Sequence, residues 1–434
     1  MNLSDLLRHA AADPTAPLLA DLRLIAAVSP DLAAAPLAAA GAEELVDGYA
    51  RTPVPTVTGA VLARDEAGLV EACVAALTED ADRVLLVDSG STDDTVRRAE
   101  AAHPRVRTVE APWCDDFAHH RNLALREVAA GWVMFVDADE VLCAEHAGHL
   151  RRVLRALDHV LPDTDLVVCP TVVDTDGTVY TENRRILRAT TSLSFRGRVH
   201  ERPYDAAGGN PPRVYVPLRL DHSGYTPQEI ARKQKHRRNG HLLALARRDE
   251  PDNPKWVYHA IRDTLDPAAA APDVLRERFA ELAGAVEALP PTAADYVSER
   301  RHDSWVLLCE LALGFGGAEE ILHWSGRLEE VGGRVEAAYF RGVLETSRLL
   351  SRLSALAEQL GGAERWETPD NRALLGRLFE VQATAALASG RYELVEPACR
   401  KAADRGAGRG LADDLGGLRQ LLSRLDGAGG AGEA

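Results

Sequence analysis

The sequence predicts an α/β domain with a mostly parallel sheet, followed by an all-α, repeat-like region. Two observations lead to this expectation. Apolar runs of strand type alternate with amphipathic helical segments from residue 56 to about 140, and strand patterns disappear after about residue 226. Alternating strands and helices are typical of a parallel sheet that is covered by helices on both faces.

The alternating segments follow one another in a regular order. Each predicted strand is a short apolar run, and the predicted helices have helical spacing of apolar residues or capping and stop signals. We expect strands at 56–63, 83–91, 105–112 and 132–140, with helices at 66–77, 91–102 and 117–131. Two extended runs, 165–173 and 178–188, are joined by the turn sequence DTDG, which predicts a hairpin.

The remaining segments define the predicted domains. Residues 1–52 are Ala- and Leu-rich and broken by prolines, so we expect a helical extension that packs on the sheet edge, forms a dimer contact or recognises a leader peptide. The α/β domain covers 53–226. Residues 227–425 predict helices separated by Pro and Gly, which suggests a tetratricopeptide-like array without a clean 34-residue period. The Gly-rich tail, 426–434, is expected to be disordered.

Composition argues against several classes of protein. The formal net charge of −16 argues against a nucleic-acid binder, because such proteins neutralise phosphates with Lys and Arg. No run approaches the ~20 apolar residues that a membrane helix needs. The N-terminus lacks a signal-peptide pattern, so we expect a cytoplasmic protein. The six cysteines are widely spaced, which predicts neither a disulfide framework nor a zinc site.

The chemistry is expected at the carboxyl ends of the strands, where open parallel sheets bind ligands. Asp-X-Asp pairs occur at 80/82, 137/139, 163/165 and 174/176. Only Asp137 and Asp139 directly follow a buried strand, with Glu140 beside them, and the other pairs are expected in turns. Three adjacent carboxylates repel one another unless a cation compensates. A divalent cation bridging to a diphosphate would do so, and a solvated strand end is the alternative.

These segments resemble glycosyltransferase family 2, which has the GT-A fold. The resemblance rests on LLVDSGSTDDT (85–95), PWCDDFAHHRNLALREVAAGWVMFVDADE (112–140), FRGRVHERPY (195–204) and LRLDHSGYTPQEIARKQKHRRNGHLL (218–243). It covers about residues 56–226. Enzymes of this subtype often carry a C-terminal helical repeat domain, as the sublancin-type peptide S-glycosyltransferases do.

The resemblance implies a set of residues that bind the nucleotide sugar: Ala63, Arg64, Asp65, Glu66, Asp88, Arg121, Asn122, Asp137 and Ala138. Asp88 would accept a hydrogen bond from uracil, and Asp137 would bind the ribose or the sugar. The family often has Asn in place of Asp65, which puts the role of that residue in doubt. Asp139 would hold Mn²⁺ or Mg²⁺, and His222 is a further candidate ligand, although it also suits a hydrogen-bonded loop.

The resemblance further implies an inverting reaction, in which one base deprotonates the acceptor. Glu201 is the preferred base and His200 the second choice, and the alternative is that the two residues only order the acceptor loop. Trp113 and Tyr225 are candidates for the acceptor side, and both also suit core packing. The basic stretch 232–238 is either a solvated helix face or a clamp for a phosphate or an acidic acceptor.

Three functional hypotheses remain open. The first is a transferase that moves a sugar from a UDP-sugar to a peptide or protein, with the helical region binding the acceptor. The second keeps this chemistry with a small-molecule, lipid or glycan acceptor. The third is an inactive transferase domain that supports helical repeats as an interaction scaffold. A homodimer is compatible with each of them.

Overall fold

The computed structural model describes residues 1–37, 41–224 and 235–408, together with 410, 413, 416–421, 423 and 424. Tyr225 and the tail 426–434 lie outside the described residues. The chain divides into two compact units, of which the first comprises Met1–Ala269 and Ala280–Ser304 and the second comprises Ala270–Phe279 and Trp305–Ala434.

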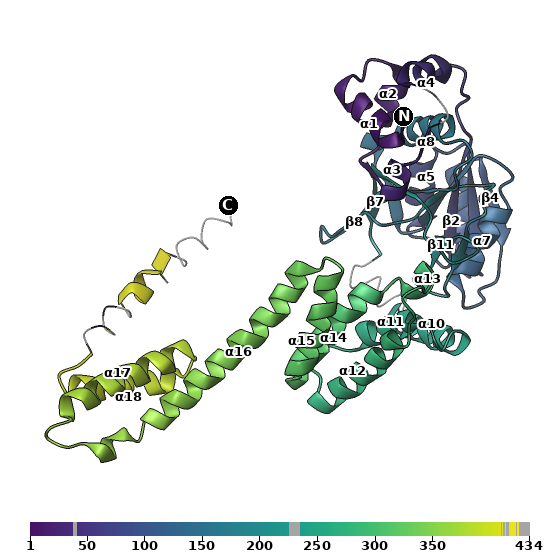
Figure 1. The fold of residues 1–434 in the computed structure, drawn as a ribbon. Coiled ribbons are helices and arrows are strands. Elements are labelled where there is room, and N and C mark those ends of the chain that lie inside the picture. The colour runs from purple at the N-terminus through teal and green to yellow at the C-terminus, as the bar shows by residue number, and fades with distance from the viewer. Residues whose placement is uncertain are drawn as a thin grey trace. The chain divides into compact units, whose positions relative to one another are not determined.

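A mixed sheet forms the centre of the first unit (Figure 1). Its strands are β1 (Ala27–Val28), β2 (Val57–Ala63), β3 (Arg83–Asp88), β4 (Val106–Glu110), β5 (Trp132–Asp137), β6 (Glu140–Leu142), β7 (Val167–Asp174), β8 (Val179–Tyr180), β9 (Ile186–Arg188) and β12 (Arg213–His222). The order is β1-β12-β7-β9-β5-β2-β3-β4, with β6 beside β12 and β8 beside β7. Strands β5, β2, β3 and β4 are mutually parallel, as are β7 and β12, whereas β9 runs antiparallel between β5 and β7. The predicted α/β class and the hairpin after β7 are confirmed.

Helices cover both faces of this sheet. They are α5 (Val70–Leu77), α6 (Thr95–Ala102), α7 (Phe117–Arg126) and α8 (His149–Val160). Val61 and Leu86 point into a core shared with α5, α6 and α8, whereas Ala60 and Leu85 point into a second core shared with α7. This division follows from the alternation of side chains along a strand. A separate pair of short strands, β10 (Ser194–Arg196) and β11 (Arg202–Tyr204), lies beyond β9 in the chain.

The N-terminal extension completes the α/β core. It forms α1 (Leu3–Ala12), α2 (Pro17–Leu22), α3 (Pro30–Ala33) and α4 (Ala42–Tyr49), in agreement with the helical extension that the sequence predicts. Strand β1 pairs with β12 and forms the edge of the sheet there, and α2 and α4 pack on α8 (Figure 1). Asp21 accepts hydrogen bonds from Tyr49 Oη at 2.6 Å and Arg152 Nε at 2.6 Å. Of the three roles considered, the structure supports packing on the sheet edge.

The first unit continues past residue 226, where the sequence predicted that the α/β domain ends. Helices α10 (Lys235–Asp249), α11 (Pro254–Thr264) and α13 (Asp295–Ser298) belong to it, and α12 (Pro272–Glu287) spans both units. Leu242, Trp256 and Tyr296 from these helices share a core with Val199 and Tyr204 of the α/β domain. This shared core fixes the loop that carries Glu201.

The second unit is entirely helical in its described part. It contains α14 (Arg301–Phe315), of which the first residues lie in unit one, α15 (Ala318–Glu330), α16 (Arg334–Leu360), α17 (Arg372–Ala388) and α18 (Tyr392–Ala403). From α15 onward each helix packs on the next along the chain, as in a helical repeat. Among the described residues, none of the helices combines the length and the apolarity that crossing a membrane requires.

Candidate active site

The carboxyl ends of adjacent parallel strands bring the predicted donor-side residues to one edge of the sheet. Strand β2 lies between β3 and β5, and its register pairs Ala63 with Asp88 and Leu62 with Asp137. Asp88 and Asp137 therefore flank the end of β2. This is the position at which an open α/β sheet binds its ligand.

The loops after β2 and β3 are tied together by side chains. Asp65 has a left-handed φ of 54°, and its Oδ1 accepts from Thr92 N at 2.7 Å. Asp88 accepts from Ser91 N at 3.1 Å and from Ser91 Oγ at 2.5 Å. Asp65 therefore has a structural role that the sequence did not predict. In the preceding residues, Ala63 is buried and Arg64 is exposed, while Glu66 after Asp65 is buried.

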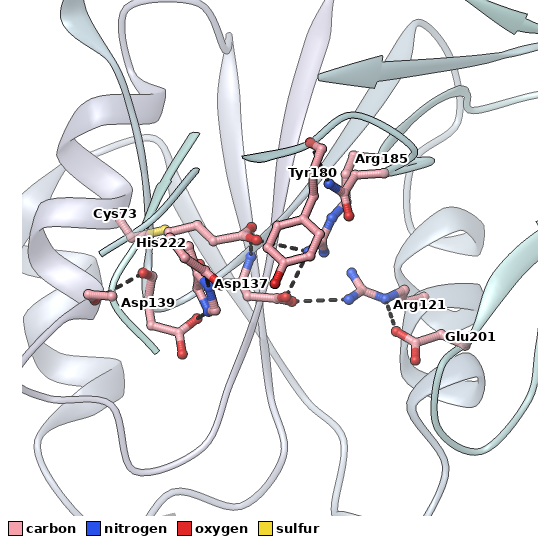
Figure 2. Close-up of polar contacts among 12 residues, drawn as sticks. Cys73, Arg121, Asp137, Asp139, Tyr180, Arg185, Glu201 and His222 are labelled. Carbon is pink, nitrogen blue, oxygen red and sulfur yellow. Dashed lines mark hydrogen bonds and ion pairs between the residues drawn. The ribbon is translucent and has the colours of Figure 1, made fainter. Parts of the chain in front are cut away.

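Arg121 bridges Asp137 and Glu201, the carboxylates predicted for the donor side and for the base (Figure 2). Its Nη2 contacts Asp137 Oδ1 at 3.0 Å, and its Nε donates to Glu201 Oε1 at 2.5 Å. The neighbouring Asn122 hydrogen-bonds the backbone of Phe195 instead of a carboxylate of the site. Its Nδ2 donates to the carbonyl of Phe195 and its Oδ1 accepts from the amide of the same residue, at 2.9 and 2.8 Å. Asn122 therefore anchors β10 to α7, although the sequence predicted that it faces the nucleotide.

A second arginine, which the sequence did not predict at the site, compensates two of the three clustered carboxylates. Arg185 Nη2 contacts Asp137 Oδ2 at 3.0 Å and Glu140 Oε1 at 2.8 Å. Burial by itself would raise the pKa of Asp137, but Arg185 and Arg121 outweigh it and hold that pKa well below its ordinary range. Burial raises the pKa of Glu140 to about 7, with Asp137 adding to the rise and Arg185 opposing it.

The third carboxylate, Asp139, faces a histidine. His222 Nε2 lies 3.6 Å from Asp139 Oδ1 (Figure 2), while His222 Nδ1 lies 2.5 Å from Asp174 Oδ1. Metal-binding histidines commonly hold their second ring nitrogen on a carboxylate in this way, which orients the ring. Burial lowers the pKa of His222, but Asp139 and Asp174 outweigh it and raise the pKa to about 8. One carboxylate oxygen and one imidazole nitrogen thus converge, and they fit a Mn²⁺-type ion.

The Asp174–Asp176 pair is one of those that the sequence pattern places in turns. This describes Asp176, whose Oδ1 accepts from Thr178 N at 2.8 Å, but not Asp174, which orients His222. We expect Asp174→Asn to weaken Mn²⁺ binding by about 10- to 100-fold, because the ring loses its anionic partner. Titration calorimetry with Mn²⁺ measures the affinity of each variant. Asp176→Asn is the matched control, and an equal loss in both variants would contradict the assignment.

Gly224 lies against the same pair of residues. A Cβ on Gly224 would overlap Asp139 Oδ2 and lie 2.5 Å from His222 Nε2. We therefore expect Gly224→Ala to displace one or both side chains and to weaken Mn²⁺ binding at least about tenfold. The control is Gly240→Ala in α10, where a Cβ meets nothing within 4 Å and helix propensity favours alanine. Unchanged Mn²⁺ affinity in Gly224→Ala would show that the site tolerates the methyl group.

The predicted acceptor-side residues lie in different places. His200, the second-choice base, has a left-handed φ of 52° and hydrogen-bonds Asp263 of α11 at 3.3 Å, so its ring is bound to that helix. Trp113 packs edge-on against Phe117 at 4.8 Å beside the core of α10 and α11, which favours a packing role. Tyr225 is not among the described residues. Ala138, between the two site aspartates, is buried.

Two other residues also reach the site, and only Tyr180 of these was not considered from the sequence. Tyr180 of the hairpin has its ring beside Asp137 and Arg185 in Figure 2, and the residue is 45% exposed. Arg238, from the basic stretch that the sequence left undecided, is half-buried against Phe117. Burial lowers the pKa of Arg238, and Asp137 and Asp139 oppose that effect. Of the residues that were not predicted at the site, Asp174 could have been recognised from its position, because it ends a parallel strand just as Asp137 does.

Residues 60–224 match the model of glycosyl transferase family 2. The chain is 29% identical to the SPbeta prophage-derived glycosyltransferase SunS of Bacillus subtilis over 326 residues, which is 74% of each protein. It is also 34% identical over 91 residues to a TPR repeat-containing protein of Synechococcus elongatus, covering 21% of this chain and 22% of that protein.

Among solved structures, the chain is similar to TarS of S. aureus, with a TM-score of 0.35 and 12% identity over 60% of this chain and 54% of TarS. A structure of TarS residues 1–349 in complex with UDP has a TM-score of 0.37 and 12% identity, over 62% of this chain and 92% of that one. The family match runs from β2 to β12 and so includes Asp139, Glu201 and His222.

Proposed function

We propose, from the match of residues 60–224 to the model of glycosyl transferase family 2, that the chain is an inverting, metal-dependent transferase that uses a UDP-sugar. The observation that carries the proposal is the convergence of Asp139 and His222, with Asp174 holding the far side of the imidazole. Asp137 and Glu140 are already compensated by Arg185. We assign the divalent cation to Asp139 because its carboxylate oxygen and the Nε2 of His222 face each other.

Such a cation would supply charge neutralisation to the departing diphosphate. The arginines add to this: among the described residues, Nη1 of Arg121 and Nη1 of Arg185 are buried without a hydrogen-bond partner. Cationic donors that are already desolvated suit the oxygens of a diphosphate on which charge develops. The same two side chains contact the two carboxylate oxygens of Asp137, which keeps that carboxylate ionised for the ribose or the sugar hydroxyls.

Glu201 is the proposed base. Arg121 binds its Oε1, and among the described residues its Oε2 makes no hydrogen bond, so that oxygen can receive the proton of the acceptor. The acceptor atom attacks the anomeric carbon as its proton passes to Glu201. The bond from that carbon to the diphosphate oxygen breaks on the opposite face, and one such displacement inverts the anomeric centre.

The proposed acceptor is a peptide side chain. Support comes from the sequence resemblance to peptide S-glycosyltransferases and from the helical second unit, in which α16 exposes Tyr339 (61%) and Leu350 (40%). Exposed apolar side chains on a helical array suit an extended peptide. A small-molecule or glycan acceptor remains the alternative, and it requires no role for α16.

The test is a panel of nucleotide sugars incubated with the full chain and Mn²⁺ or Mg²⁺, with and without a chelator. We expect slow release of UDP from one UDP-sugar, abolished by the chelator, and transfer of that sugar to members of a peptide library, detected by mass spectrometry. Transfer only to small glycans would favour the alternative acceptor. No turnover and no thermal stabilisation by any nucleotide would instead favour an inactive scaffold.

A further inference from the structure

A second cluster of metal-binding side-chain types lies on α11, apart from the Asp139–His222 pair. It consists of His200, from the loop before β11, and of His259 and Asp263, one helical turn apart on α11. One donor atom from each of the three side chains lies within 4.8 Å of the other two. The proposed transfer reaction uses none of these side chains.

His259 is the least expected member of this cluster. It is fully buried, and neither of its ring nitrogens has a hydrogen-bond partner among the described residues. Buried polar groups in folded proteins are nearly always paired, so an unpaired imidazole needs an explanation such as a bound ion or water. Its ring lies face to face with that of His200, with 3.9 Å between centroids and 10° between planes.

The surroundings hold the other two side chains in place. Arg262 Nε donates to Asp263 Oδ1 at 2.8 Å, which leaves Oδ2 directed at His200 Nε2, 3.3 Å away. The backbone of His200 is in the left-handed region, and its carbonyl accepts from the buried Lys255 Nζ at 3.5 Å. Strained conformations of this kind persist where the surrounding structure imposes them, and they cluster at binding sites.

We propose that His200, His259 and Asp263 bind a transition-metal ion of the Zn²⁺ type, with water completing the coordination. Two imidazoles and one carboxylate form a donor set found in zinc sites, and nitrogen-rich sets favour Zn²⁺ over Mg²⁺. Ligation brings both ring nitrogens to about 2.1 Å from one centre. The imidazoles must therefore tilt out of their parallel stack, and the partly exposed His200 has room to do so.

Such an ion would join the loop that carries Glu201 to α11. His200 directly precedes Glu201, and both lie in the turn between the antiparallel strands β10 and β11. The inference does not depend on the proposed reaction, because Zn²⁺ binding is measured without any sugar donor.

The experiment uses the full-length Asp139→Asn protein, so that the Asp139–His222 site does not contribute to binding. Metal-free protein is titrated with Zn²⁺ by calorimetry, and zinc is counted by elemental analysis after desalting. We expect one Zn²⁺ per chain. Adding Asp263→Asn, or separately His200→Asn, is expected to weaken that binding at least about tenfold.

The matched control is Asp249→Asn, which removes a partly exposed carboxylate of α10 that pairs with Arg198. It is expected to leave Zn²⁺ affinity unchanged. Circular dichroism of each variant verifies that it is folded. The proposal is overturned if the Asp139→Asn protein binds no stoichiometric Zn²⁺, or if binding persists unchanged in both cluster variants, which would assign the ion to another site.

Discussion

Asp139→Asn is expected to lower both sugar transfer and donor hydrolysis by about 10³-fold or more. The stabilisation that a divalent cation gives to a departing diphosphate is several kcal/mol, and each ~1.4 kcal/mol corresponds to tenfold in rate. The amide keeps the shape of the carboxylate but removes the charge opposite His222. Steady-state rates at saturating Mn²⁺, with UDP release as the readout, measure the effect.

The control for Asp139→Asn lies in another Asp-X-Asp pair. Asp163 is exposed, and no side-chain contact ties it to the described site. Asp163→Asn is expected to change the rate less than about twofold, as surface substitutions usually do. A second readout is the thermal shift caused by Mn²⁺ with UDP, which should disappear in Asp139→Asn alone. If the variant retains that thermal shift, the metal does not bind at Asp139.

Glu201→Gln is expected to lower transfer by about 10²- to 10⁴-fold, the usual contribution of a general base. Glutamine can still accept a hydrogen bond from Arg121 Nε, so the geometry of the bridge to Asp137 should survive. Binding of UDP with Mn²⁺ should therefore be nearly unchanged, and the loss should appear in kcat. Measuring kcat separately from the UDP affinity distinguishes a lost base from a collapsed site.

The neighbouring residue provides the matched comparison for this assignment. His200→Asn retains a residue type that tolerates left-handed backbone but removes the imidazole. Because the His200 ring is bound to Asp263 and stacked on His259, we expect transfer to fall less than about tenfold. If His200→Asn loses as much activity as Glu201→Gln, the base has been assigned to the wrong residue of the pair.

Much of the α/β domain could be predicted because its signals are local. The period of apolar residues marked β2, β3, β4 and β5 to within three residues at each end. Once these strands are parallel, their carboxyl ends share an edge, which brings Asp88 and Asp137 together without further information. Glu201 could be named only through the resemblance to a family, since nothing local distinguishes it from His200.

What the sequence determined by itself was the parallel sheet and the carboxylates at its edge, because side-chain periodicity and strand order act over short stretches of chain. Tertiary structure alone decided that Arg121 joins Asp137 to Glu201, that Asp174 orients His222, and that His200 turns toward α11. These partners lie between 16 and 80 positions apart. Their pairing depends on how segments that are distant in the chain pack against one another. A local pattern of residues does not specify that packing.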